Sequence, residues 1–551
     1  MTRVLVHGAS VVDGTGAPAR LVDVLWEGDT IVELGTCSSD GAEVVDGRGL
    51  VLCPGFVDVH THYDAQLCWD RLATPSMEHG VTTVVIGNCS LSLAPVRPDM
   101  RGRLSALFEQ IEDVPAQALV NGVSWNWETF GQYLDVIDVG LGPNVAPLVG
   151  HTPLRMAVMG QDAYVRAATP EELTAMCDAM DAAMRAGARG LSVSWLDVDE
   201  NLKPVPSRLA TDEERMALAA VVARHHGVIQ AVPNFMDANA QVGAIRLLGK
   251  MSRETGVTCS FGPLVDVPMV ATLLKNTLLT LQDEVAQGAR LAAQTCPRPF
   301  DMTLRLDGGS FLLFVLPSWM EVMRLPLPQR LEAFSDPANR MRLVFEAMAI
   351  APLLAFARIE TTVTPENAPL CGRMLVDVAR ERNQLISQTL LEISVADGLA
   401  TSFLIAGAWH ADEKTVGRLL GNPLVHVGVS DAGAHYAQFC GAGDTTYLLE
   451  RFVRERGDMT LEHAIHRLTQ EPCVFWGLGK RGVVAAGHAA DLVLLDAGEV
   501  ARGEEIPRAD LPGGASRLVR AARGIRRVWV AGQEVLRDGA YTAARPGRVV
   551  P

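Results

Sequence analysis

Both ends of the chain show short apolar stretches that alternate with polar positions and are separated by Gly and Asp turns. Residues 1–54 contain VLVHGASVVDGTG, DVLWEGDTIVELG and AEVVDGRGLVLCP, and residues 483–551 repeat this texture in GHAADLVLLD and VWVAGQEV. Such alternation with frequent turn signals predicts short β-strands. We therefore expect one small β-sandwich domain built from both termini, with the rest of the chain inserted between them.

The central part of the chain, residues 55–482, alternates apolar strand candidates with helical stretches. The strand candidates are Thr83–Ile86, Val145–Val149, Gly190–Ser194, Val228–Val232, Val257–Phe261 and Val425–Val429. Residues 171–185 carry Ala, Leu and Met at helical spacing, and Thr211 with Glu214 forms a capping-box pattern before a second helix. The alternation predicts an α/β fold with a parallel (β/α)8 TIM-type barrel.

Residues 286–370 interrupt this alternation. They are rich in proline and contain Gly308-Gly309 between amphipathic stretches. Long irregular segments in a barrel often carry function. We expect a lid over the barrel mouth, with a structural or oligomer-facing segment as the alternative.

Composition and charge narrow the classes of function. The 551 residues carry a net charge of -16, which disfavours nucleic acid and anionic membranes as partners. No apolar run reaches the roughly 18 residues of a membrane span, and the N-terminus shows no signal pattern. The ten cysteines are scattered without a CxxC pair, which favours a cytoplasmic protein with reduced thiols.

Two histidines follow a buried strand candidate near the start of the central region. The strand Gly55–Val59 runs directly into His60-Thr61-His62. Residues at i and i+2 of a strand point to the same face, so both imidazoles can reach one metal ion. The alternative is a chance HxH pattern. The C-terminal ends of barrel strands are where catalytic groups sit, and this favours a metal site.

Two further strand ends carry candidate metal ligands. Cys89 follows a strand in the loop that opens with Gly87-Asn88, where a thiolate would bind zinc well. The alternative is a buried cysteine that acts as a small hydrophobic residue. Asp431 ends the buried strand around Val425–Val429 and is a candidate for metal ligand and catalytic general base together, with an Asx-type cap as the alternative.

Two segments carry a resemblance to a known family. PGFVDVHTH, residues 54–62, resembles the first metal motif of the amidohydrolase superfamily, and GVTTVVIGNCSLSLAP, residues 80–95, resembles its D-aminoacylase (N-acyl-D-amino-acid deacylase) branch. The resemblance implies a zinc-dependent barrel with an insertion over its site, with Cys89 as a ligand and Asp431 as the late-barrel catalytic aspartate. His151 and Arg155 lie in a segment similar to one of this branch, which makes both of them candidates for substrate binding. His151 would have either a catalytic role, in which it orients the substrate, or a purely structural one.

The chain departs from this branch at two later strands. The branch carries two more histidines there, but residues 228–234 and 257–263 contain none. His225 and His226 precede the first of these strands, on the wrong side of a barrel for catalysis. We therefore expect about one zinc per chain, held by His60, His62, Cys89 and Asp431, with a second metal as the alternative. The remaining candidates to line the substrate pocket are Gln230, Asn234 and Cys259.

The combined pattern predicts a metal-dependent hydrolase of a linear amide C–N bond that acts on a small molecule. Asp431 would accept the proton of the attacking water. A hydrolase of cyclic amides or lactams on the same scaffold is one alternative. A non-catalytic relative that binds a small ligand or serves as a scaffold is another, because the two later histidines are missing. A homo-oligomer is compatible with the sequence.

Overall fold

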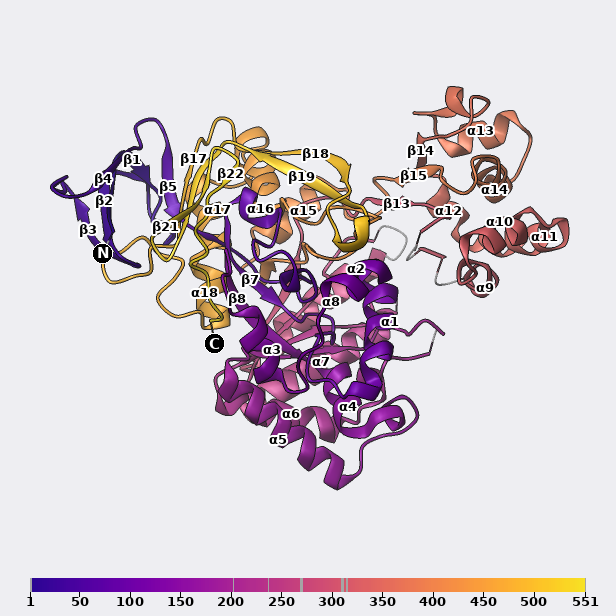
Figure 1. Ribbon diagram of the computed structural model, residues 1–551, viewed down its shortest axis with the longest axis horizontal. Coiled ribbons are helices and arrows are strands. Elements are labelled where there is room, and N and C mark those ends of the chain that lie inside the picture. The colour runs from indigo at the N-terminus through magenta and orange to yellow at the C-terminus, as the bar shows by residue number, and fades with distance from the viewer. Residues whose placement is uncertain are drawn as a thin grey trace.

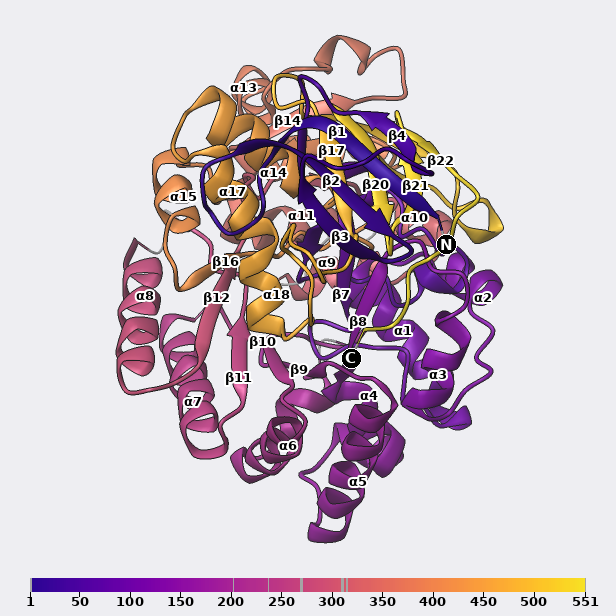
Figure 2. The ribbon, with the colours of Figure 1, turned by 90° about the vertical axis from the view of Figure 1, so that its left-hand side faces the viewer.

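Eight parallel strands form the central sheet of the protein (Figures 1 and 2). The computed structural model describes residues 2–201, 203–235, 237–267, 271–308, 312–313 and 316–550. Adjacent strands pair in the order β6 (Phe56–Asp58), β7 (Val81–Ile86), β8 (Asn144–Gly150), β9 (Gly190–Ser194), β10 (Val228–Val232), β11 (Thr258–Phe261), β12 (Leu291–Thr295) and β16 (Val425–Val427). Beyond the two edge strands, Thr61 and Ala432 form a parallel bridge, and the His62 N–H donates to the Ala432 carbonyl at 2.8 Å. These contacts bring the edges together, so the predicted TIM-type barrel is confirmed.

Helices cover the outside of the barrel strands (Figure 2). They include α1 (Arg101–Glu112), α4 (His151–Met159), α5 (Pro170–Ala186), α6 (Asp212–Arg224), α7 (Ala238–Thr255), α8 (Ala271–Ala286), α15 (Glu413–Leu420), α17 (Leu461–Leu468) and α18 (Gln470–Trp476). The predicted helix at residues 171–185 is α5, which begins at a Thr169–Glu172 capping box and ends at Gly187 with φ of 119°. Its buried Met176, Met180 and Met184 pack in the main hydrophobic core.

One barrel strand was not predicted, and it corrects the start of the insertion. The strand β12 lies within residues 286–370, which the sequence pattern assigned to the insertion, but it pairs with β11 and β16 inside the barrel. Its sequence LAAQT lacks the β-branched run that marked the other strands. The barrel therefore continues to Thr295, and the inserted segment begins after it.

The inserted segment forms a unit with its own hydrophobic core. Its elements are β13 (Met302–Leu304), α9 (Pro317–Met323), α10 (Leu327–Ser335), α11 (Pro337–Glu346), α12 (Ala351–Leu354), β14 (Ala357–Thr361), α13 (Leu375–Glu381), α14 (Ile386–Ala396) and β15 (Ser402–Ile405). The three strands form a small sheet in the order β13-β15-β14. A core that runs from Met302 to Ala408 is separate from that of the barrel, and Figure 1 shows the unit projecting to one side. That it covers the barrel mouth stays a prediction.

Both termini contribute to one nine-stranded sheet, as the sequence pattern predicts. Its strands are β1 (Arg3–Val11), β2 (Arg20–Glu27), β3 (Thr30–Gly35), β4 (Glu43–Asp46), β5 (Val51–Pro54), β17 (Leu492–Leu495), β20 (Ile525–Val530), β21 (Gln533–Arg537) and β22 (Ala540–Tyr541). Three strands separate β2 from β20, yet Trp26 and Trp529 meet edge to face with ring centroids 5.4 Å apart. The sheet therefore folds over its own core. A separate hairpin of β18 (Ala501–Arg508) and β19 (Arg517–Arg523) extends from it.

None of the helices in the described residues is both long enough and apolar enough to cross a bilayer.

Candidate metal centre

His60 and His62 lie just beyond β6, where hydrogen bonds to neighbouring segments fix the backbone. The Thr61 N–H donates to the Val85 carbonyl at 3.1 Å, and the Asp431 N–H donates to the His60 carbonyl at 3.2 Å. Both imidazoles are buried, with ring centroids 5.4 Å apart. The alternation of side chains in an extended segment thus places both rings inside the barrel at the C-terminal end of its first strand.

Cys89 reaches the same point from the end of β7. The turn before it needs Gly87, whose φ is 79° and whose missing Cβ would lie 2.2 Å from the Leu148 carbonyl oxygen. Asp64 fixes this turn, because its carboxylate accepts from the Gly87 N–H at 2.9 Å. The Cys89 Sγ lies 3.3 Å from the His60 Nε2 and 3.8 Å from the His62 Nε2.

Asp431 approaches from the opposite edge of the barrel, after β16. Its Oδ1 lies 3.4 Å from the His60 Nε2 and 3.7 Å from the His62 Nε2. Its backbone is left-handed, with φ of 54°. The carboxylate therefore faces both histidines, and the structure brings together all four ligands that the sequence suggested.

The donor atoms of His60, His62 and Cys89 are spaced for a single small metal ion, and the Asp431 carboxylate lies beside the two histidines. Tetrahedral zinc with bonds of about 2.0–2.3 Å places its donor atoms roughly 3.3–3.6 Å apart. The donor separations of 3.3, 3.4, 3.7 and 3.8 Å come close to this spacing. The donor atoms of His60, His62 and Cys89 also lie within 4.8 Å of one another. Two imidazoles, a thiol and a carboxyl match the chemistry of a zinc site.

Two residues that the sequence did not reveal orient the imidazoles. The His60 Nδ1 lies 2.8 Å from the Gln294 Oε1, and the Gln294 amide in turn donates to the Ser260 hydroxyl at 3.0 Å. The His62 Nδ1 lies 3.1 Å from the Glu112 Oε1. Because the amide oxygen of Gln294 can only accept from the His60 Nδ1, the His60 Nε2 presents its lone pair to the centre, and the nearby Glu112 carboxylate favours the same arrangement of His62.

Burial and nearby charges set the ionisation of the centre. Burial alone would raise the pKa of Asp431, but its hydrogen bond with His62 and the charge of His60 lower it below the usual range. Burial raises the pKa of the Cys89 thiol, against the opposing effect of His62. A metal would displace that thiol proton, since thiolate is the form that binds. Asp431 is thus an ionised acceptor.

Two more buried carboxyl groups lie close to the centre and also escaped the sequence analysis. Burial raises the pKa of Asp64 to about 7 and that of Asp197 to about 6, and the charge of His62 opposes both shifts. Asp64 follows the HTH motif by two positions, so its proximity to His62 was a signal in the sequence. Asp197 follows β9 in an irregular loop and carries no such signal.

The positions on β10 and β11 that face the centre hold an amide and a hydroxyl group. The Gln230 Oε1 accepts from the Cys89 N–H at 3.3 Å, so this predicted pocket residue supports a metal donor directly. Ser260 holds Gln294. Cys259, which the sequence placed in the pocket, points the other way into the outer core because side chains alternate along a strand. Asn234 lies two residues beyond β10, and its substrate-binding role stays a prediction.

His151 and Arg155 belong to a buried cluster around Glu214, and their roles in catalysis and substrate binding stay predictions. The His151 ring nitrogens lie 2.8 Å from the Glu214 Oε1 and 3.2 Å from the Ser207 hydroxyl. Arg155 pairs with the other Glu214 oxygen and donates to the Arg166 carbonyl at 2.8 Å. Glu214 therefore serves this cluster and does not complete the predicted capping box, although Thr211 does cap α6. His225 likewise lies outside the barrel, 2.8 Å from Asp181.

Comparison with known proteins extends this geometry. A sequence profile described as "Amidohydrolase family" matches residues 43–536. D-aminoacylase of Alcaligenes xylosoxydans xylosoxydans is 31% identical over 550 residues, spanning 99% of this chain and 97% of that protein. A solved D-aminoacylase with a binuclear metal center has a TM-score of 0.67 and 27% identity, with 99% of each chain covered. N-acyl-D-glutamate deacylase from Bordetella bronchiseptica, complexed with zinc and a phosphonate inhibitor, has a TM-score of 0.67 and 26% identity, with 100% of each chain covered.

The profile match includes every barrel strand and all four converging donors. The length of this match and the similarity of the relatives over the whole chain agree with the barrel fold. They also agree with the position of the donors at the C-terminal ends of the strands. The chain therefore belongs to the amidohydrolase family.

Proposed function

We propose that this protein hydrolyses the linear amide bond of an N-acyl-D-amino acid, with one zinc ion at the candidate metal centre. The observation that carries the proposal is that the Cys89 Sγ and the Asp431 Oδ1 each lie 3.3–3.8 Å from the Nε2 atoms of His60 and His62. When bound, a divalent metal supplies Lewis acidity, which acidifies water and polarises a carbonyl group.

Asp431 is the proton carrier in this proposal. Its carboxylate is ionised and lies at the open side of the barrel, so it can accept a proton from the attacking water. The water oxygen bonds to the amide carbon, the C–N bond breaks, and Asp431 returns the proton to the leaving nitrogen. Gln294 and Glu112 keep the two imidazoles oriented throughout. The products are a carboxylate and a free amine.

The choice of one metal rests on the side chains from β10 and β11. A second metal needs a further set of donors beside Cys89. Gln230 and Ser260 face the centre from these strands, and both are neutral groups with hydrogen bonds of their own. Zinc is proposed because imidazole and thiolate donors favour it over magnesium or calcium.

The substrate class follows the names of the relatives, a D-aminoacylase and an N-acyl-D-glutamate deacylase. Both names describe the release of a D-amino acid from an acyl group. The ten free cysteines favour a reducing, cytoplasmic setting, which completes the proposal.

A matched panel of substrates tests the proposal. The purified protein, loaded with zinc, is incubated with N-acetyl-D-amino acids and their L-enantiomers, and release of the free amine is measured. We expect turnover of at least one D-compound and a slower rate for its enantiomer. Turnover of dihydropyrimidines or lactams alone would support a cyclic amide hydrolase instead, and bound metal without any turnover would support a binding protein.

A further inference from the structure

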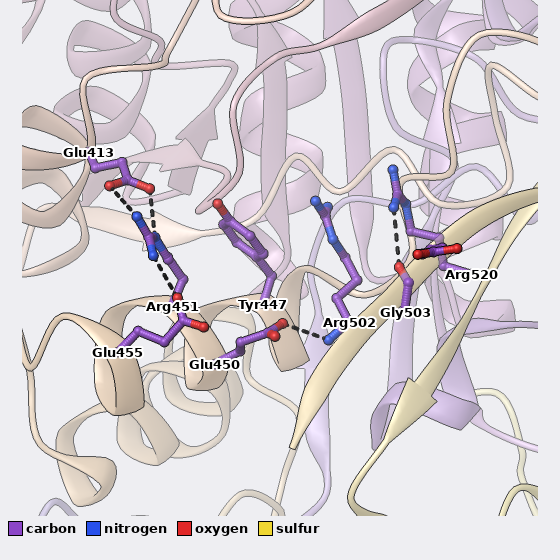
Figure 3. A pocket seen from close by; sticks show the side chains of 9 residues that line it. Glu413, Tyr447, Glu450, Arg451, Glu455, Arg502, Gly503 and Arg520 are labelled. Atoms are coloured by element: carbon purple, nitrogen blue, oxygen red, sulfur yellow. Dashed lines mark hydrogen bonds and ion pairs between the residues drawn. The ribbon is translucent and has the colours of Figure 1, made fainter. Parts of the chain in front are cut away.

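A second cavity lies apart from the candidate metal centre. It has a volume of about 410 Å³ and lies between the hairpin β18–β19 and the helical segment of α16 (Asp444–Tyr447) and η10 (Leu448–Glu455) (Figure 3). None of the four metal donors lines it. A cavity of this size suits a small molecule.

The arginine at one end of this cavity is already paired. The Arg451 guanidinium contacts both oxygens of Glu413, at 2.7 and 2.8 Å, and an oxygen of Glu455 at 2.6 Å (Figure 3). These three contacts use the nitrogen atoms of its guanidinium group. Arg451 therefore has no free donor with which to bind a further anion.

The other end holds an arginine whose donors are not used. The Arg502 side chain is 14% exposed, and its guanidinium stacks over the Tyr447 ring at 4.5 Å from the centroid. Its nearest carboxylate oxygen is the Asp444 Oδ1 at 3.9 Å, which is too long for a hydrogen bond. Within the described residues, neither this guanidinium nor the Tyr447 hydroxyl makes a side-chain hydrogen bond. Figure 3 shows the Tyr447 side chain between those of Arg451 and Arg502.

The surroundings explain why Asp444 does not satisfy Arg502. The same Asp444 oxygen accepts from the Arg298 Nε at 3.0 Å, so it is held by another arginine. Arg520 adds a further guanidinium at this end, with contacts to the Gly503 carbonyl at 3.2 Å and to Glu505 at 3.0 Å. Burial lowers the pKa of Arg502, and the charge of Arg520 adds to that effect. A nearly buried cation without hydrogen-bond partners is costly.

We propose that this cavity binds a small molecule through a carboxylate group, which accepts hydrogen bonds from the Arg502 guanidinium and the Tyr447 hydroxyl. The planar fork of arginine matches the two oxygens of a carboxylate, and stacking on Tyr447 holds the fork in place. Glu450 also lines the cavity, but its carboxylate accepts from the backbone N–H of Arg502 at 2.9 Å, and within the described residues it makes no hydrogen bond with the guanidinium. This site is independent of the proposed amide hydrolysis.

The test is a titration of the zinc-loaded protein with sodium acetate at constant ionic strength. The melting temperature of the protein is measured at each acetate concentration. A ligand that binds the folded state raises this temperature in a saturable manner. We expect Arg502→Gln to lower the affinity for acetate, taken from the saturation of this effect, by about tenfold or more. Arg451→Gln removes the same charge from the same cavity. The affinity for acetate should stay within about twofold of the wild-type value, because Arg451 is already paired. Acetate bound at the metal centre would persist in Arg502→Gln.

Three outcomes would overturn the proposal. They are the absence of a saturable effect in the wild type, equal weakening in both arginine variants, and an Arg502-dependent effect of phosphate without one of acetate. Tyr447→Phe keeps the stacked ring and removes only the hydroxyl group, so it provides a test even where Arg502→Gln fails to fold. We expect this variant to bind acetate more weakly, by a factor of up to about ten, and an unchanged affinity would contradict the assigned contact. Titration with free D-alanine distinguishes an amino acid from a simple carboxylate.

Discussion

Asp431 shows how one residue can serve the metal centre in two ways. Its Oδ1 faces both histidines, and its backbone N–H ties it to the His60 carbonyl. The side chain is therefore fixed by the same segment that carries the first two donors. Its lowered pKa makes it a carboxylate near neutral pH, which is the form that a proton acceptor requires.

Asp431→Asn should remove catalysis and keep the fold. Asparagine has nearly the same size but cannot accept the proton, and loss of a general base typically costs about 10²–10⁴-fold in rate. Steady-state turnover of the best substrate in the panel measures the effect, beside a thermal melt of both proteins. A variant that retains more than about a tenth of the wild-type rate would exclude Asp431 as the base.

Cys89→Ala should lower the metal content of the purified protein. The thiol forms a possible metal-binding group with His60 and His62, and its removal leaves an incomplete zinc site. Cys37→Ala and Cys177→Ala are the controls, because these residues lie outside the barrel interior, near the terminal sheet and on α5. Elemental analysis of all three variants decides the point, and equal metal content would assign Cys89 to packing.

Gln294→Leu should weaken metal binding without removing a donor. Leucine cannot accept the His60 Nδ1 proton, so the ring loses the contact that orients it. Loss of such a supporting contact typically costs about 10–100-fold in metal affinity. Competition with a chromogenic zinc chelator measures the change, and Gln287→Leu, at the exposed turn just after α8, is the control. An unchanged affinity would show that the backbone alone orients His60.

The proximity of the four candidate donors could be expected from the sequence because each follows a recognisable strand and has the side chain of a metal ligand. Gln294 and Glu112 could not, because glutamine is not a usual zinc ligand and both lie far along the chain from the histidines that they hold. The resemblance placed His151 at the substrate. Its environment depends on Glu214 from another helix, which no local pattern revealed.

At the scale of elements, the error at β12 has a physical cause. Its small residues pack inside a closed barrel and need no bulky β-branched side chains, so the periodicity gave no strand signal. Conversely, helix α5 was predictable to within a residue, since its capping box, amphipathic face and terminal glycine all agree.

The cluster of His151, Arg155 and Glu214, which joins α4 and α6, should contribute to the stability of the folded protein. Glu214→Ala would leave His151 and Arg155 buried without their carboxylate, and breaking such a pair typically costs about 3–5 kcal/mol. Denaturant unfolding measures the loss. Glu213→Ala alters the exposed neighbour on the same helix and should change stability little. Equal effects of the two substitutions would contradict the assignment.

This cluster also predicts a dependence of stability on pH. Burial raises the pKa of Glu214, but its contacts with His151 and Arg155 outweigh this and lower it to about 2. A carboxyl group with a lowered folded-state pKa stabilises the protein above its unfolded pKa of about 4.3, and this contribution is lost as the pH falls towards 2. The difference in stability between wild type and Glu214→Ala should therefore narrow over that interval.

At the scale of the molecule, the two termini and the barrel depend on each other. The nine-stranded sheet combines strands from both ends of the chain, and the Gly55 N–H donates to the Asp491 carbonyl at 2.8 Å just before the first barrel strand. The sequence predicted this arrangement because both ends share one pattern. It did not predict the bounds of the inserted unit, whose helices resemble those of the barrel in composition.

The central claim is that one metal ion, held by His60, His62, Cys89 and Asp431, is enough for amide hydrolysis. The most direct measurement titrates metal-free protein with zinc and follows turnover of an N-acyl-D-amino acid. Activity should rise linearly and reach its maximum at about one equivalent of zinc per chain, since the donor atoms of His60, His62 and Cys89 lie within 4.8 Å of one another with Asp431 beside the two histidines. Activity that appears only as a second equivalent binds would contradict it.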